Sequence, residues 1–148
     1  SKEDHENATK KAFMTSPEKL PLEKDFKENF EKIKKIKNVE IFVITSRTDD
    51  MLEHLQNYLK YHKIYVDGII NTNNKNKAEV LKKINADIFV EDSPFKLWQI
   101  LKEDPDLPCK LILYRNLQNK NEKKPSKEVI EVNGWEELKN FILAYKSF

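Results

Sequence analysis

Glycine is almost absent from this 148-residue chain, which contains only Gly68 and Gly134. A phosphate-binding P-loop and a dinucleotide-binding fingerprint each require two or more closely spaced glycines, so both classes of nucleotide site are excluded. Cysteine is equally scarce. The single Cys109 rules out an internal disulfide framework and fits a reducing compartment, so we expect a cytoplasmic protein.

Long hydrophobic runs are also lacking. No apolar stretch approaches the roughly 20 residues that a membrane-spanning helix needs, and the charged first twenty residues contain no signal-peptide core. We therefore expect no membrane partner.

Arginine is rare as well: of the 27 basic residues, only Arg47 and Arg115 are arginine, and the net charge is only +2. Sites for nucleic acids usually depend on arginine and on aromatic side chains that stack with bases. The lysine-rich segment 116–127 contains no aromatic residue. The sequence gives no strong nucleic-acid signal.

The chain does contain enough hydrophobic residues, 39% of the total, to build a core. Apolar residues recur alternately at helical spacing and in short β-branched runs. The expected helices are 23–37, 49–63, 77–84, 94–102 and 135–145, and the expected strands are 39–44, 65–70, 88–90, 110–114 and 129–132. This alternation predicts a three-layer α/β fold with a parallel sheet. Residues 1–12 are expected to form a flexible N-terminal arm and residues 13–148 one domain, with an irregular lead-in over 13–22.

Polar side chains follow two of these strands. Thr45 follows the strand 39–44, and Glu91 with Asp92 follows the strand 88–90, while Lys77 begins the helix between them. Ligands of open parallel sheets bind at the carboxyl ends of the strands, so we expect these residues to share a crevice. A hydroxyl and an ammonium suit a phosphate, and carboxylate oxygens suit Mg²⁺.

Each of these residues also has an ordinary structural interpretation. A threonine after a strand is usually a cap or turn residue, and a lysine at a helix start is usually solvated. An acidic pair after a strand also commonly caps the next helix, which here starts at Ser93 and Pro94. Arg47 is compatible with phosphate binding or with a solvated surface.

Taken together, the segments VITSR (43–47), NKAEVL (76–81) and DIFVEDSP (87–94) resemble the haloacid dehalogenase (HAD) superfamily of phosphohydrolases. Within it the chain is most similar to the 5′(3′)-deoxyribonucleotidase-like phosphatases. The resemblance implies a Rossmann-like fold and a phosphorylated small-molecule substrate such as a nucleotide. It implies that Thr45 and Lys77 are catalytic and bind phosphate together with Ser46 and Arg47. It also implies that Asp92, with Glu91 beside it, holds Mg²⁺.

One motif of that superfamily is missing: the Asp-x-Asp that follows the first strand and supplies the nucleophile. The only Asp-x-Asp here is Asp104–Asp106, in the proline-containing EDPDLP, where we predict a turn. Two functions therefore remain open. The chain is either a Mg²⁺-dependent nucleotidase-type phosphohydrolase or an inactive HAD-like binding module, a pseudoenzyme.

The missing motif has a structural counterpart. In the superfamily its strand lies at the centre of the sheet, between the strands that here end at Thr45 and Glu91, so the sequence predicts a missing or remodelled central strand. Exposed strand edges promote aggregation, so we expect the slot to be filled or closed. An upstream segment or a partner chain could fill it, or the two flanking strands could pair directly.

Overall fold

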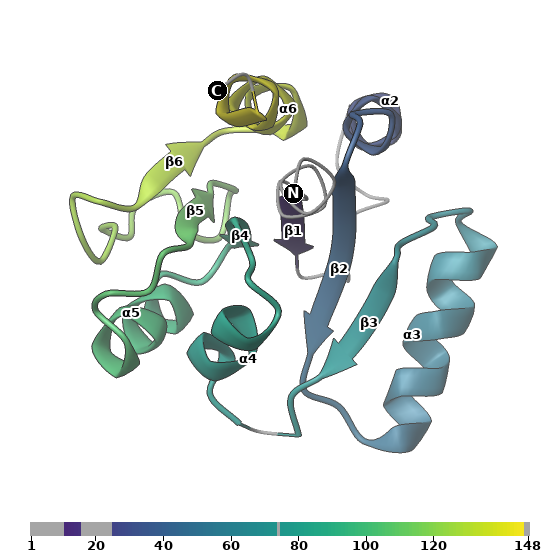
Figure 1. The fold of residues 1–148 in the computed structure, drawn as a ribbon, viewed down its shortest axis with the longest axis horizontal. Helices are drawn as coiled ribbons and strands as arrows, with labels where there is room; N and C mark the ends of the chain where they lie inside the picture. The colour runs from purple at the N-terminus through teal and green to yellow at the C-terminus, as the bar shows by residue number, and fades with distance from the viewer. Residues whose placement is uncertain (1–10, 16–24, 74, 147–148) are drawn as a thin grey trace, which may run out of the picture.

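The computed structural model describes residues 11–15, 25–73 and 75–146. This part of the chain forms a three-layer Rossmann-like α/β fold around a parallel sheet of six strands in the order β3-β2-β1-β4-β5-β6 (Figure 1). The elements are β1 (Lys11–Thr15), α2 (Phe26–Lys34), β2 (Val39–Thr45), α3 (Asp49–Tyr61), β3 (Gly68–Asn71), α4 (Lys77–Lys83), β4 (Ile88–Glu91), α5 (Pro94–Glu103), β5 (Lys110–Tyr114), β6 (Ile130–Val132) and α6 (Trp135–Lys146).

The expectation of a missing or remodelled central strand is wrong. β1 lies between β2 and β4 and pairs in parallel with both, Phe13 standing opposite Ile41 on one side and Ile88 on the other. The chain itself therefore fills the slot, without an upstream segment, a partner chain or direct pairing of the flanking strands. Residues 11 and 12, expected in the N-terminal arm, and residues 13–15, expected in the irregular lead-in, form this strand. The rest of both segments lies outside the described residues.

The helices cover the two faces of the sheet in separate groups. α2, α3 and α6 pack on one face, whereas α4 and α5 pack on the other (Figure 1). The chain crosses from one face of the sheet to the other between β3 and β4, and these two strands lie on opposite sides of the central strand β1. This reversal makes the carboxyl edge of β1 the topological switch point, where open α/β sheets bind their ligands.

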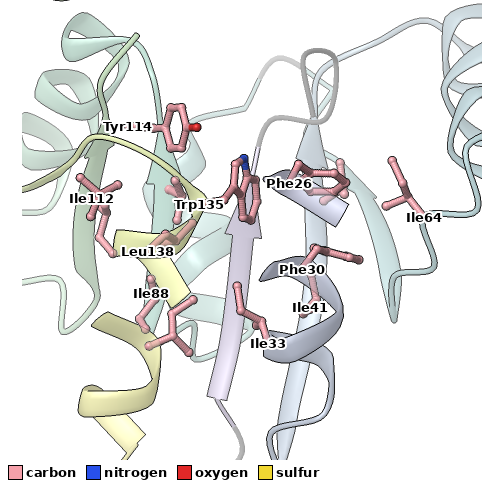
Figure 2. Close-up of a cluster of buried hydrophobic side chains, with 14 of the residues drawn as sticks. Phe26, Phe30, Ile33, Ile41, Ile64, Ile88, Ile112, Tyr114, Trp135 and Leu138 are labelled. Atoms are coloured by element: carbon pink, nitrogen blue, oxygen red, sulfur yellow. The ribbon is translucent and has the colours of Figure 1, made fainter. Parts of the chain in front are cut away.

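Aromatic side chains dominate the core beneath α2 and α6. The ring centroids of Phe26 and Trp135 are 4.7 Å apart and those of Phe26 and Phe30 are 5.0 Å apart. Figure 2 shows these rings beside Ile33 and Leu138. Trp135 is 2% exposed, whereas Trp98 on α5 is 43% exposed.

Two helices end in Schellman motifs without the glycine that usually occupies the left-handed position. After α3, Lys63 has φ 56°, and the Ile64 N–H donates to the Leu59 carbonyl at 2.9 Å. After α4, Asn85 has φ 55°, and the Ala86 N–H donates to the Leu81 carbonyl at 2.9 Å. Asparagine tolerates this conformation, but lysine adopts it at a cost.

Asp104 and Asp106 lie in a turn, as predicted, between α5 and β5. The Asp106 N–H donates to the Asp104 carboxylate at 3.2 Å. This turn precedes β5 and so lies at the opposite edge of the sheet from Thr45 and Glu91. Of the helices in the described residues, none has the length and apolar character needed to cross a membrane.

Candidate functional site

The predicted site residues lie along the carboxyl edge of the sheet. Thr45 is the last residue of β2 and Glu91 the last residue of β4, and both side chains are buried. β1 separates these two strands, so their ends are two strand spacings, or about 10 Å, apart. An anion above the end of β1 would lie within about 5 Å of both strand ends.

Lys77 and Glu91 form a buried ion pair across this edge. The Asn76 side chain caps α4 by accepting the Ala78 N–H at 2.7 Å, and this fixes Lys77 as the first residue of the helix. The Lys77 ammonium lies 3.3 Å from Glu91 Oε1, and the two side chains are 17% and 1% exposed. Lys75, two residues earlier in the chain, is exposed. The structure thus brings together Lys77 and the acidic pair.

The Glu91 carboxylate also holds the chain that enters α5. Its Oε2 accepts the Asp92 N–H at 2.9 Å and the Ser93 N–H at 3.2 Å. Burial raises the pKa of Glu91 above its ordinary value of 4.5, while the charge of Lys77 acts in the opposite direction. Both oxygens of Glu91 therefore have partners within the protein.

Asp92 lies beside two asparagines that the sequence analysis did not single out. Its Oδ2 accepts a hydrogen bond from Asn116 Nδ2 at 3.3 Å. The buried Asn119 donates from Nδ2 to the carbonyls of Asp92 at 2.7 Å and Tyr114 at 2.8 Å. Asn119 therefore ties the ends of β4 and β5 together. The one feature of the sequence that could have pointed to Asn119 is the asparagine-rich segment that follows the strand at 110–114.

Arg47 folds back onto the end of β2. Its Nε donates to Thr45 Oγ1 at 2.7 Å. The Asn71 side chain, at the end of β3, accepts the Arg47 N–H at 3.2 Å and donates to the Arg47 carbonyl at 2.7 Å. Arg47 is half-buried and Ser46 is exposed. Thr45 and Arg47 thus form one hydrogen-bonded unit, which Asn71 holds in place.

The two halves of the edge are joined through β3. The buried Thr72 donates its N–H to the Thr45 carbonyl at 2.8 Å and accepts the Lys75 N–H at 2.9 Å. Because Lys75 stands just before α4, this link sets the position of Lys77 relative to Thr45. The structure therefore places the unit of Thr45 and Arg47 on one side of the β1 end and the pair of Lys77 and Glu91 on the other.

The site fits Mg²⁺ poorly, although the superfamily resemblance implies this ion. Mg²⁺ prefers octahedral oxygen ligands and is usually held by one or two carboxylates. Here Glu91 is committed to one ammonium and two backbone N–H groups, and Asp92 already accepts from Asn116. Within the described ranges, no group of three or more His, Cys, Asp or Glu residues is placed to hold a metal ion.

The position directly after the first strand, where the superfamily has its nucleophilic aspartate, has other residues in this chain. β1 has the sequence KAFMT, and Ser16, Pro17 and Glu18 follow it. The next aspartate is Asp25, which is exposed at the start of α2 and accepts the Asn29 N–H on its backbone carbonyl. The central strand is thus present, but no aspartate follows it at short range.

Comparisons with known proteins support the fold alone. Neither the family models nor the curated proteins contain a match to this chain. Among solved structures, the chain is similar to a de novo designed Rossmann 3x3 fold protein determined by solution NMR. The two share 16% sequence identity with a TM-score of 0.50, over 90% of this chain and 93% of the designed one. This agrees with the predicted three-layer Rossmann-like architecture.

Proposed function

We propose that this chain is a HAD-like module without phosphohydrolase activity that binds a phosphorylated small molecule, such as a nucleotide, at the carboxyl edge of its sheet. The single observation that carries the proposal is the central strand β1, which pairs on both sides but leads into Thr15, Ser16 and Pro17 instead of Asp-x-Asp. Covalent phosphoryl transfer in this superfamily starts from that aspartate, so the chain lacks the group that would begin the reaction.

Phosphate binding does not need that aspartate. Thr45 offers a hydroxyl, and Arg47 and Lys77 bring two positive charges to the two sides of the β1 end. A guanidinium presents paired donors that match a phosphate, and an ammonium adds a compact point charge. The exposed Ser46 adds a hydroxyl beside them. The lone Cys109 fits a cytoplasmic setting for such a module.

A nucleotidase-type phosphohydrolase is the second candidate. The observation in its favour is that Lys77 and Glu91 lie 3.3 Å apart, so a lysine and an acidic pair do share one site. In such an enzyme Thr45 and Lys77 would stabilise the transferring phosphoryl group. It would still need a nucleophile that the residues around the end of β1 do not supply.

One experiment separates the two functions. Binding of inorganic phosphate and a panel of nucleoside monophosphates is measured by calorimetry, and turnover of the same panel is measured with Mg²⁺. We expect saturable binding without turnover. Lys77→Ala should weaken binding by about 10- to 150-fold, since a charge-assisted hydrogen bond contributes about 1.5–3 kcal/mol. Lys75→Ala, which removes an exposed charge nearby, should leave binding unchanged. Turnover that disappears in Asp92→Asn would refute the proposal and favour the enzyme.

A further inference from the structure

Two positively charged side chains at the carboxyl edge are held in place by the protein itself. Arg47 is fixed at its backbone by Asn71 and at its Nε by Thr45, with distances of 2.7–3.2 Å. Lys77 is fixed by the capped start of α4 and by Glu91. Both cations are therefore oriented before any ligand arrives, which lowers the entropy cost of binding.

The carboxylates at the same edge are engaged in a way that opposes metal binding. Coordination by Glu91 would break its contacts with Lys77 and with the N–H groups of Asp92 and Ser93. Each of these contacts involves a charged acceptor in a buried setting, where leaving a polar group unpaired is unfavourable. A divalent cation at Glu91 would also lie close to the Lys77 ammonium, which repels it.

We infer that this site binds its phosphate without Mg²⁺, and that the Arg47 guanidinium and the Lys77 ammonium supply the positive charge that the ion supplies in the superfamily this chain resembles. The inference rests on the proposed function and extends it, because it names the charges that recognise the ligand. The Lys77 ammonium has three N–H donors, and the contact with Glu91 uses one of them. The Nε of Arg47 bonds Thr45 and its Nη2 is buried, so this guanidinium contributes to the site mainly as a fixed positive charge.

The first test measures the affinity for inorganic phosphate by calorimetry, once with EDTA and once with millimolar Mg²⁺. We expect the same dissociation constant in both conditions. Arg47→Gln should weaken binding about tenfold, equivalent to about 1.4 kcal/mol, in both conditions. Arg47→Lys keeps the positive charge but loses the bond from Nε to Thr45, and its affinity should lie between those of the wild type and Arg47→Gln. Binding that occurs only with Mg²⁺ would overturn the inference and leave the proposed function standing.

The second test asks directly for a metal site, with Mn²⁺ as the probe and water-proton relaxation as the readout. The full chain, with and without phosphate, should show no saturable Mn²⁺ binding. Stoichiometric binding that Asp92→Asn abolishes would overturn the inference even if phosphate also binds. Absence of phosphate binding under every condition would overturn both the inference and the proposed function, so the two failures are distinguishable.

Discussion

Replacing Glu91 with leucine is the sharpest test of how the carboxyl edge is held together. The substitution keeps a side chain of similar size in a position that is 1% exposed, so it creates little cavity. It removes the ion pair with Lys77 at 3.3 Å and the single oxygen, Oε2, that accepts the N–H groups of Asp92 and Ser93. The variant therefore leaves three donors at the buried edge without this acceptor.

The expected loss follows from those three donors. Breaking a buried ion pair by removing one partner costs about 3–5 kcal/mol. Leaving a buried N–H unsatisfied costs about 1–3 kcal/mol, and these terms overlap because they describe the same carboxylate. The apolar surface that leucine buries offsets about 1.5–3 kcal/mol. We therefore expect Glu91→Leu to lower the free energy of unfolding by about 3 kcal/mol.

Urea denaturation followed by circular dichroism measures this loss. Glu91→Gln keeps a carbonyl oxygen for the two N–H groups and should lose less stability than Glu91→Leu. Glu131→Gln is the matched surface control, because Glu131 pairs with Arg115 at 3.0 Å but is 39% exposed, and it should lose less than about 1 kcal/mol. If Glu91→Leu unfolds within about 0.5 kcal/mol of the wild type, the reasoning is refuted.

Three further predictions concern single positions. Burial raises the pKa of Glu91 against the opposing charge of Lys77, so the folded state holds this proton more tightly than the unfolded state. The stability that the wild type has relative to Glu91→Gln should be full below about pH 4.5 and fall as pH rises through the raised pKa. Urea midpoints of both proteins measured against pH check this, and a difference that instead grows with pH would contradict it. Asn119→Leu should lower stability by about 2–4 kcal/mol, because buried Nδ2 bonds two carbonyls; thermal unfolding measures the loss, and the exposed Asn121→Leu should be near neutral. Lys63→Gly should raise stability by up to about 1 kcal/mol, since Lys63 has φ 56°; a lower urea midpoint would show that the residue is not strained.

The placement of the predicted site residues at one edge of the sheet followed from the sequence, because each residue ends or begins an element with a clear local pattern. Thr45 and Glu91 end buried strands, and Lys77 begins a helix capped by Asn76. The carboxyl ends of parallel strands share one edge, so a prediction of proximity needs only the identity of the elements. Which of Lys75 and Lys77 faces Glu91 required the geometry of the helix start.

The roles of the asparagines in the site could not be predicted from local sequence patterns. Asn71, Asn116 and Asn119 act through partners 24–27 residues away in the chain. Asparagine is also common in turns and loops for local reasons. A sequence pattern gives no signal for hydrogen bonds that depend on how distant strands line up.

The sequence by itself determined the alternation of strands and helices and the absence of an Asp-x-Asp motif after a strand. Only the tertiary structure decided that KAFMT is the central strand. A five-residue segment followed by Ser16 and Pro17 has little local preference, and its pairing with β2 and β4 supplies the hydrogen bonds that make it a strand. Strand order depends on contacts between distant parts of the chain, and local periodicity carries no information about them.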